Sequence, residues 1–371
     1  MVNKTTNILI LGGYGVTGSM IANLLLQESE VKLVLAGRSM EKAQAKAAEL
    51  NSLFPGNRVM GAYADASNEA TLKTLFESVD LVIVASSTSA YARQIARSAI
   101  QSGIDYLDIQ YSSSKLQTLH SLEREIVDAG CCFITDGGFH PGLAALLVRF
   151  MAKEFDEIEV ANVGSLIKID WASMNFAEAT IQELVEELKS FDTAYYSNGK
   201  WKKGGSIDQR VMDFGRIFGR QLCTPMHLHE MDELPTRYPT LKETGFFVGG
   251  FNWFVDWVVI PIAFCAFYLN ADRLTKKMGS FMNWGLVTFS KPPYGTMLKI
   301  EASGWKDNEQ ITKELTYYHS DGYMLTAISV VACILQYLDG SIKKPGLWTQ
   351  ANLVQPEQMV TDLIKMGVSR L

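Results

Sequence analysis

Short apolar runs alternate with amphipathic segments along the first 135 residues of the chain. Residues 8–11 are apolar, a glycine-rich turn follows, and residues 19–27 then carry apolar side chains at helical spacing. Further apolar runs precede helical patterns at residues 31–36, 81–85 and 106–109, and residues 132–135 close the series. Strands that alternate with helices predict an α/β fold with a Rossmann-type, doubly wound parallel sheet.

The pattern changes after Pro141. Residues 157–169 alternate in the manner of a strand with one wet face, and Asn198-Gly199 between aromatic residues predicts a tight hairpin. Residues 297–304 and 310–319 predict an antiparallel pair, and residues 324–338 and 356–366 return to helical spacing. We therefore expect a Rossmann domain over residues 1–140 with a C-terminal return over about 340–371, and a second α+β domain with an antiparallel sheet over 141–339.

Composition narrows the class of protein. The chain has 371 residues, of which 47% are hydrophobic and 20% charged, as in a globular protein large enough for two cores. A net charge of −6 without an arginine-rich run argues against a nucleic-acid partner. Five cysteines without paired spacing indicate reduced, buried thiols. The polar first residues lack a signal-peptide pattern, so we expect a cytoplasmic location.

A phosphate-binding fingerprint follows the first predicted strand. The residues Gly13, Tyr14, Gly15, Val16, Thr17 and Gly18 match G-x-G-x-x-G between a strand and a helix. We expect Gly13 to permit the tight turn, Gly15 to let the backbone approach a pyrophosphate, and Gly18 to allow close packing of the helix. The alternative is a glycine-rich loop without a ligand, which the repeated strand-helix units make less favourable.

The end of the second strand indicates which dinucleotide binds. NAD-specific sites place an acidic residue there, whereas this chain has Arg38 and Ser39, which suit a ribose phosphate. NADP is therefore the predicted cofactor, unless Arg38 is merely a solvated residue at a helix start. Asp65, which follows the third strand, is a candidate contact to the adenine or an N-cap of the next helix. Ser86 and Ser87 follow the fourth strand, at residues 81–85, where the nicotinamide half should bind.

Together with these residues, three later motifs resemble the saccharopine dehydrogenase-like oxidoreductases. They are Gly138-Phe139-His140-Pro141-Gly142, Gly322-Tyr323 through Thr326-Ala327-Ile328, and Lys344-Pro345-Gly346, which join Ala36-Gly37-Arg38-Ser39 and the fingerprint. The resemblance implies a Rossmann domain, an inserted α+β substrate and dimerisation domain, and a C-terminal segment that returns to the first domain. It also implies a homodimer and an active site in the cleft between the domains.

One residue departs from the family pattern. Members that act on amino-acid imines often carry Asp before the Pro-Gly pair, where this chain has His140, and the sequence shows no arginine cluster for a dicarboxylic amino acid. Other members resemble reductases of lipid-like double bonds or carbonyls. We therefore expect hydride transfer to or from a C=N, C=O or C=C centre of a small or lipid-like substrate.

His140 is the candidate proton donor. It follows the sixth strand at the carboxyl edge of the sheet, and Pro141 suits the first turn of a helix. That position would lower the pKa of the imidazole through the helix dipole. The alternative is a capping histidine that binds only the loop. Tyr111, which follows the fifth strand at the same edge, is the reserve donor.

Two further segments carry alternatives. Residues 246–269 are the most apolar stretch, and we expect them to pack against protein as an interface or pocket wall rather than to make peripheral membrane contact or insert. His227 and His229, beside Glu230, could suggest a metal site. Two ligands one residue apart have no obvious third, however, so no metal site is predicted.

The sequence thus predicts an NADP-dependent oxidoreductase. The alternative is a non-catalytic NADP-binding protein that acts as a membrane-associated sensor or partner protein.

Overall fold

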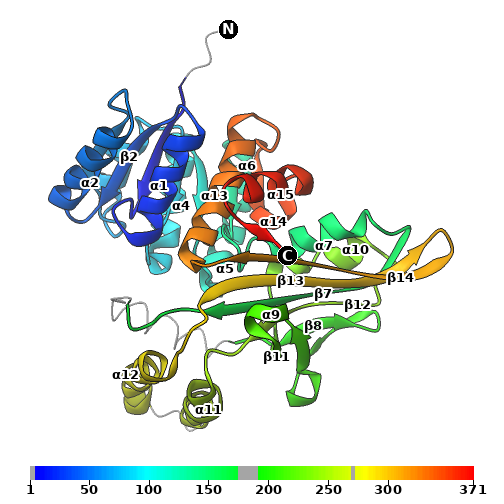
Figure 1. The fold of residues 1–371 in the computed structure, drawn as a ribbon. Helices are drawn as coiled ribbons and strands as arrows, with labels where there is room; N and C mark the ends of the chain where they lie inside the picture. Colours follow the sequence, from blue (N-terminus) through cyan, green and yellow to red (C-terminus); the bar gives the residue numbers. More distant parts are fainter. Residues whose placement is uncertain (1–4, 174–190, 269–271) are drawn as a thin grey trace. The chain divides into compact units, whose positions relative to one another are not determined.

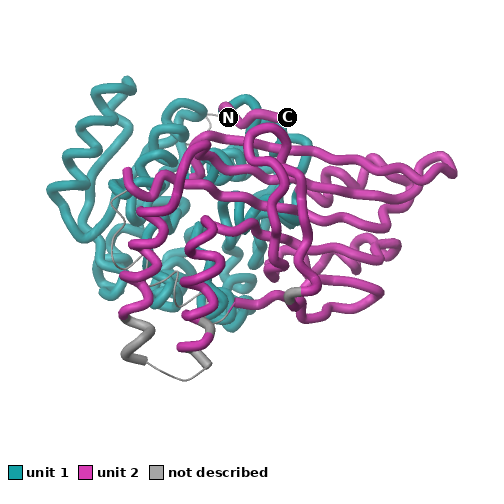
Figure 2. Tube along the Cα trace, turned by 60° about the horizontal axis from the view of Figure 1, so that its bottom comes forward, with its two compact units in different colours: residues 1–146, 323–366 teal, residues 147–322, 367–371 magenta. Residues whose placement is uncertain are grey.

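The computed structural model describes residues 5–173, 191–268 and 272–371, and the chain divides into two compact units. Unit 1 comprises Met1–Leu146 and Tyr323–Met366, and unit 2 comprises Leu147–Gly322 and Gly367–Leu371 (Figure 2). The chain re-enters unit 1 at Tyr323, earlier than the expected 340, because the long apolar helix α13 (Gly322–Leu338) is buried there almost throughout. The last five residues belong to unit 2 instead of unit 1.

Unit 1 is built on a seven-stranded sheet in which the strands of the described residues all pair in parallel. The strand order is β15-β6-β5-β4-β1-β2-β3. The strands are β1 (Asn7–Leu11), β2 (Lys32–Gly37), β3 (Val59–Tyr63), β4 (Leu81–Val84), β5 (Asp105–Asp108), β6 (Cys132–Thr135) and β15 (Gly346–Thr349). This is the predicted Rossmann sheet, with β15 as a seventh strand that the sequence pattern did not indicate.

Helices connect these strands along the chain. They are α1 (Val16–Glu28), α2 (Met40–Leu53), α3 (Glu69–Phe76), α4 (Ala92–Ser102), α5 (Ser113–Ser121), α6 (Glu123–Asp128) and α7 (Ala144–Ala152), and after the return α14 (Gln350–Leu353) and α15 (Pro356–Lys365). The central strands are buried on both faces, and all four residues of β4 are fully covered. Such strands need apolar side chains at every position, which explains why β4 has the sequence Leu-Val-Ile-Val.

Unit 2 contains a nine-stranded sheet of mixed direction. Its main order is β10-β11-β12-β7-β13-β14-β16, with β8 beside β12 and β9 beside β8. The strands are β7 (Glu157–Lys168), β8 (Ala194–Ser197), β9 (Lys200–Lys203), β10 (Arg210–Asp213), β11 (Arg220–Met226), β12 (Glu243–Gly249), β13 (Gly295–Lys306), β14 (Glu309–His319) and β16 (Ser369–Arg370). The expectation of an antiparallel sheet is wrong at one place, because β12 and β7 pair in parallel.

The predicted hairpin is present in unit 2. β8 and β9 pair antiparallel, and Asn198 and Gly199 between them have φ values of 53° and 80°. Both turn positions therefore occupy the left-handed region that Asn and Gly tolerate best, which is the backbone that a two-residue turn of this kind requires. The predicted pair of residues 297–304 and 310–319 is likewise confirmed as β13 and β14, which are in register along their whole length.

The apolar stretch 246–269 is divided among three elements. It covers the end of β12, a π-helical turn at Val255–Val259 and helix α11 (Ile260–Tyr268), while Leu269 lies outside the described residues. Helix α12 (Asp272–Phe289) runs beside α11 (Figures 1 and 2). Among the described residues, no helix combines the length and apolar character that a membrane span requires.

This helical pair has a buried face and an exposed one. Val255, Val259 and Met282 are buried in a shared apolar cluster. In contrast, Trp253 is 61% exposed, Trp257 70% and Trp284 50%. The stretch 246–269 was expected to pack against protein throughout. Within this chain, only one face of its helical part does so.

Candidate nucleotide and catalytic site

The turn after β1 has its left-handed residue at Gly12. Gly12 has φ +88°, and a Cβ built on it would lie 2.7 Å from the carbonyl oxygen of Ala85. The left-handed conformation thus occurs one residue before Gly13. A Cβ on Gly13 would lie 2.9 Å from both the Ile10 carbonyl oxygen and the Leu35 side chain in β2, so a glycine at this position fits the role expected of it in the turn.

Helix α1 approaches this turn closely. A Cβ on Gly18 would lie 2.3 Å from the carbonyl oxygen of Gly12, so only glycine allows this packing. Gly15 is the N-cap residue, no side chain caps the helix, and its first turn has no acidic residue. Val16 is 60% exposed and Thr17 is half-buried. The amide groups at the start of α1 therefore meet no competing side-chain acceptor, which fits an incoming pyrophosphate.

Tyr14 connects the turn to the end of β2. Its ring lies against Gly37, where a Cβ would be only 2.6 Å from Cε1 of the tyrosine. The backbone N–H of Ser39 donates a hydrogen bond to the Tyr14 hydroxyl at 3.0 Å, and the Ser39 hydroxyl accepts one from the Lys42 amide as N-cap of α2. Arg38 is exposed beside them. A guanidinium thus stands at the position where NAD-specific sites carry a carboxylate.

Asp65 lies in the loop between β3 and α3. Its carboxylate accepts hydrogen bonds from the hydroxyl and the amide of Ser67, and these bonds lower its pKa, with a further small contribution from Arg38. The N-cap of α3 is Asn68, whose side chain accepts from the Ala70 amide. The N-cap alternative for Asp65 is therefore wrong, because the helix begins too late for that carboxylate to reach its first amides.

The loop after β4 lies against the glycine turn. A Cβ on Gly12 would meet Cβ of Ser86 at 2.8 Å, so the two loops are in contact. The Ser86 hydroxyl shares a hydrogen bond with that of Thr88 at 3.1 Å, and the Gln110 amide donates to the Ser86 carbonyl oxygen. Ser87 is exposed. Of the two serines predicted here, Ser86 is held by its neighbours and Ser87 points to solvent.

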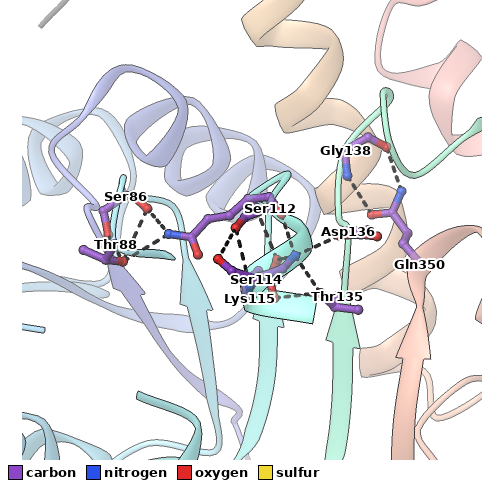
Figure 3. A network of polar contacts seen from close by, with 11 residues as sticks. Ser86, Thr88, Ser112, Ser114, Lys115, Thr135, Asp136, Gly138 and Gln350 are labelled. Carbon is purple, nitrogen blue, oxygen red and sulfur yellow. Dashed lines mark hydrogen bonds and ion pairs between the residues drawn. The ribbon is translucent and has the colours of Figure 1, made fainter. Parts of the chain in front are cut away.

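A buried lysine lies at the carboxyl ends of β5 and β6. Lys115 is fully buried, and its ammonium donates to Asp108 at 2.7 Å, to Asp136 at 2.8 Å and to the Thr135 hydroxyl at 2.8 Å (Figure 3). A fourth bond of 2.5 Å reaches the Gln110 carbonyl oxygen. Burial alone would lower the pKa of Lys115, but the two aspartates raise it above its usual value. The ammonium therefore stays charged.

This lysine fixes the start of the loop that carries His140. Asp136 is the first residue after β6 and has φ 56°, a left-handed conformation that aspartate tolerates better than most residues. Two residues later, Gly138 accepts and donates hydrogen bonds with the Gln350 side chain at 2.8 and 3.2 Å (Figure 3). The side-chain amide of Gln350 also donates to the Gly142 carbonyl oxygen at 3.1 Å. The loop is thus anchored on both sides of His140.

His140 is half-buried, and its ring lies edge-on to that of Phe139 with centroids 5.8 Å apart. Desolvation lowers its pKa to about 4, so the imidazole is neutral near pH 7. The expected place of Pro141 in the first turn of a helix is wrong. Gly142 has φ +122°, which no helix accommodates, and α7 begins only at Ala144. Burial, instead of a helix dipole, therefore keeps the imidazole neutral.

Tyr111, the reserve donor, lies in the loop between β5 and α5 and is half-buried. Sequence analysis found Tyr111 but missed Lys115, Asp108 and Asp136. A lysine one turn into an amphipathic helix is usually solvated, so its type and position gave no signal. Asp108, at the end of the short strand Asp105–Asp108, was the one available indication of a buried partner.

The family comparison concerns the N-terminal part of unit 1. The model of the saccharopine dehydrogenase NADP binding domain matches residues 8–133, from β1 to β6. This part of unit 1 is therefore similar to the NADP binding domain of saccharopine dehydrogenases. The predicted resemblance to saccharopine dehydrogenase-like proteins and the prediction of NADP as cofactor are thereby confirmed. The chain is an NAD(P)-dependent oxidoreductase.

Solved structures extend the likeness in fold to the rest of the chain. The apo saccharopine dehydrogenase (L-Glu forming) from Saccharomyces cerevisiae aligns over 99% of both chains with 16% identity and a TM-score of 0.67. A myo-inositol dehydrogenase from Corynebacterium glutamicum aligns over 98% of this chain and 95% of its own, with 12% identity and a TM-score of 0.48. No curated protein sequence matches the chain. At these identities the likeness shows the fold alone.

Proposed function

We propose that the chain transfers hydride between NADP and a C=N, C=O or C=C centre of a small or lipid-like substrate at the carboxyl edge of the unit 1 sheet. The observation that carries the proposal is the open glycine turn with the exposed Arg38 beside it. That turn leaves the α1 amides without side-chain caps, and Arg38 adds the positive charge that a ribose phosphate needs. Bound NADP supplies the hydride chemistry, with the turn holding its pyrophosphate.

The chain's own residues supply the proton side of the reaction. A neutral imidazole can donate a hydrogen bond to the heteroatom of the reacting centre and polarise it without first being protonated. The lowered pKa of His140 suits that role better than the role of a cationic acid. Lys115 and Gln350 hold the loop that presents it, and Tyr111 is the second candidate donor.

An apolar partner is the second part of the proposal. The exposed tryptophans Trp253, Trp257 and Trp284 lie on the paired helical segment of unit 2. Aromatic side chains exposed together are typical of surfaces that bind protein or lipid. We assign this surface to a second copy of the chain in a homodimer, with peripheral membrane contact as the alternative.

The experiment that tests the activity pairs binding with turnover. NADPH is titrated into the protein and followed by its fluorescence, and its oxidation is then followed with panels of imines, ketones and enones that differ in chain length. Saturable NADPH binding with turnover in one panel supports the proposal. Saturable binding without turnover in any panel favours the non-catalytic NADP-binding alternative, and absence of binding contradicts the proposed cofactor site.

A further inference from the structure

Two histidines and an aspartate converge after β11 in unit 2. One donor atom from each of His227, His229 and Asp232 lies within 4.8 Å of the others. Nε2 of His227 is 2.8 Å from Oδ1 of Asp232, and Nδ1 of His229 is 3.3 Å from Oδ2. The carboxylate therefore lies between the two imidazoles. These are two nitrogen ligands and one oxygen ligand at one point on the protein.

The third ligand is supplied by a turn that the sequence pattern did not indicate. His229–Met231 form a 3₁₀ turn, and the Asp232 amide donates to the His229 carbonyl oxygen at 3.1 Å, which brings the Asp232 side chain back toward both rings. Glu230, the acidic residue between them in the sequence, is fully buried and is not part of the cluster. Asp232 is therefore the third ligand that the sequence did not reveal, and the reason for predicting no metal site no longer holds.

A second carboxylate orients the inner histidine. Nδ1 of His227 is 3.8 Å from Oδ2 of Asp192, on the other side of the ring from Asp232, and the His227 amide donates to the Asp192 carbonyl oxygen at 2.8 Å. The ring also packs edge-on against Trp201, with centroids 5.3 Å apart, and the side chain is only 13% exposed. A carboxylate on the far nitrogen of a histidine is the usual outer arrangement around a metal-binding imidazole.

We propose that His227, His229 and Asp232 bind one Zn²⁺ ion. Imidazole nitrogen with one carboxylate oxygen is a ligand set that zinc prefers, whereas Mg²⁺ and Ca²⁺ prefer oxygen alone. Zinc bonds of about 2.0–2.2 Å require ligand atoms roughly 3.3 Å apart, so the present spacing needs only small side-chain movements. His229 and Asp232 are 43% and 44% exposed, which leaves room for those movements and for water as a fourth ligand.

The proposal predicts stoichiometric zinc binding by the full chain. A chain without a histidine tag is treated with a chelator, and Zn²⁺ is titrated against a competing chromophoric chelator. We expect one Zn²⁺ per chain, with binding at least about tenfold weaker in each of His229→Gln and Asp232→Asn. Asp192→Asn should keep the stoichiometry while it weakens binding about tenfold, because it removes only the negative charge beside the outer nitrogen of His227.

The matched control is His120→Gln, because His120 is also exposed and lies 3.6 Å from a carboxylate, that of Glu123, in unit 1. This variant should bind Zn²⁺ as the parent chain does. Melting curves without zinc establish that all variants are folded. The proposal is overturned if the parent chain binds no Zn²⁺, if His229→Gln and Asp232→Asn both retain it, or if Mg²⁺ binds equally well.

Discussion

The Lys115 ammonium lies 2.8 Å from the Asp136 carboxylate, and both side chains are almost wholly removed from water. Asp108 completes the group at 2.7 Å from the same nitrogen. One buried cation therefore balances two buried anions that belong to the ends of neighbouring strands. Because Asp136 begins the loop that carries His140, the same group that joins β5 to β6 also determines where this loop starts.

Replacing Lys115 should destabilise unit 1 strongly. In Lys115→Met the two aspartates would remain buried without a counter-charge, and we expect a loss of about 3–5 kcal/mol in the free energy of unfolding. Urea unfolding followed by circular dichroism measures the change. Lys46→Met is the control, because its pair with Glu49 is partly exposed and should contribute less than about 1 kcal/mol. Similar losses in the two variants would contradict the role given to Lys115.

Removing Arg38 should change which dinucleotide binds. We expect NADPH to bind the parent chain at least about tenfold more tightly than NADH, equivalent to about 1.4 kcal/mol. Arg38→Ala should remove most of this preference and leave NADH affinity unchanged, since the guanidinium contacts only the added phosphate. Fluorescence titrations with both nucleotides measure it, with Lys42→Ala as a control from the start of α2. Unchanged discrimination in Arg38→Ala would assign the phosphate to another residue.

His140→Asn should affect turnover more than cofactor binding. Once a substrate is found, we expect turnover to fall by about 10² or more, the usual cost of losing a hydrogen-bond donor to the reacting centre. NADPH affinity should stay within a factor of about three, because His140 follows β6 and is not part of the glycine turn after β1. Steady-state kinetics and a binding titration on the same preparation give both numbers. An unchanged turnover would shift the donor role to Tyr111.

The pKa of Asp256 gives unit 2 a pH dependence of stability. Burial raises this pKa from 3.8 to about 6, although the Phe251 amide and Lys168 act in the opposite direction. The folded chain therefore binds a proton more tightly than the unfolded chain, and stability should fall as the pH rises from 4 to 6. Asp256→Asn removes this ionisation and keeps an acceptor for the Phe251 amide. Melting temperatures should therefore show the parent losing stability relative to the variant across that window.

The exposed tryptophans should govern self-association. Because Trp253 and Trp257 are more than half exposed, the double variant W253S/W257S should retain the fold and shift the chain from dimer to monomer in sedimentation velocity. Trp305→Ser is the control, from the 40% exposed Trp305 in β13. If the dimer persists and only the parent chain floats with lipid vesicles, the surface binds membranes instead.

The sequence was sufficient to predict elements whose stability depends on local pattern. The apolar β4, the glycine turn and the Asn198-Gly199 hairpin each need particular residue types at adjacent positions, so their sequences indicate them. β15 was missed because four residues ending in Trp348-Thr349 become a strand only through pairing with β6. The parallel pairing of β12 with β7 likewise depends on partners more than 80 residues apart, which no local period records.

The residues of the candidate site likewise fall into those that the sequence could predict and those that it could not. Arg38 and His140 follow predicted strands and could be located by the rule that parallel strands place their carboxyl ends at one edge. Lys115 and Gln350 could not, because a buried charge and a buried amide are recognised only by the partners that satisfy them. The left-handed conformation of Gly12 was not predicted, since the fingerprint fixes the positions of the glycines and not their individual dihedral angles.

The seventh strand of unit 1 has a consequence for synthesis on the ribosome. β15 is formed by Gly346–Thr349, and the preceding helix α13 also belongs to this unit, whereas the other six strands are complete by Thr135. The edge of β6 that later pairs with β15 must therefore remain without its neighbour while more than 200 further residues are translated. An unpaired edge strand is a site for misassociation, so this nascent chain should need chaperone protection along β6 until translation is nearly finished.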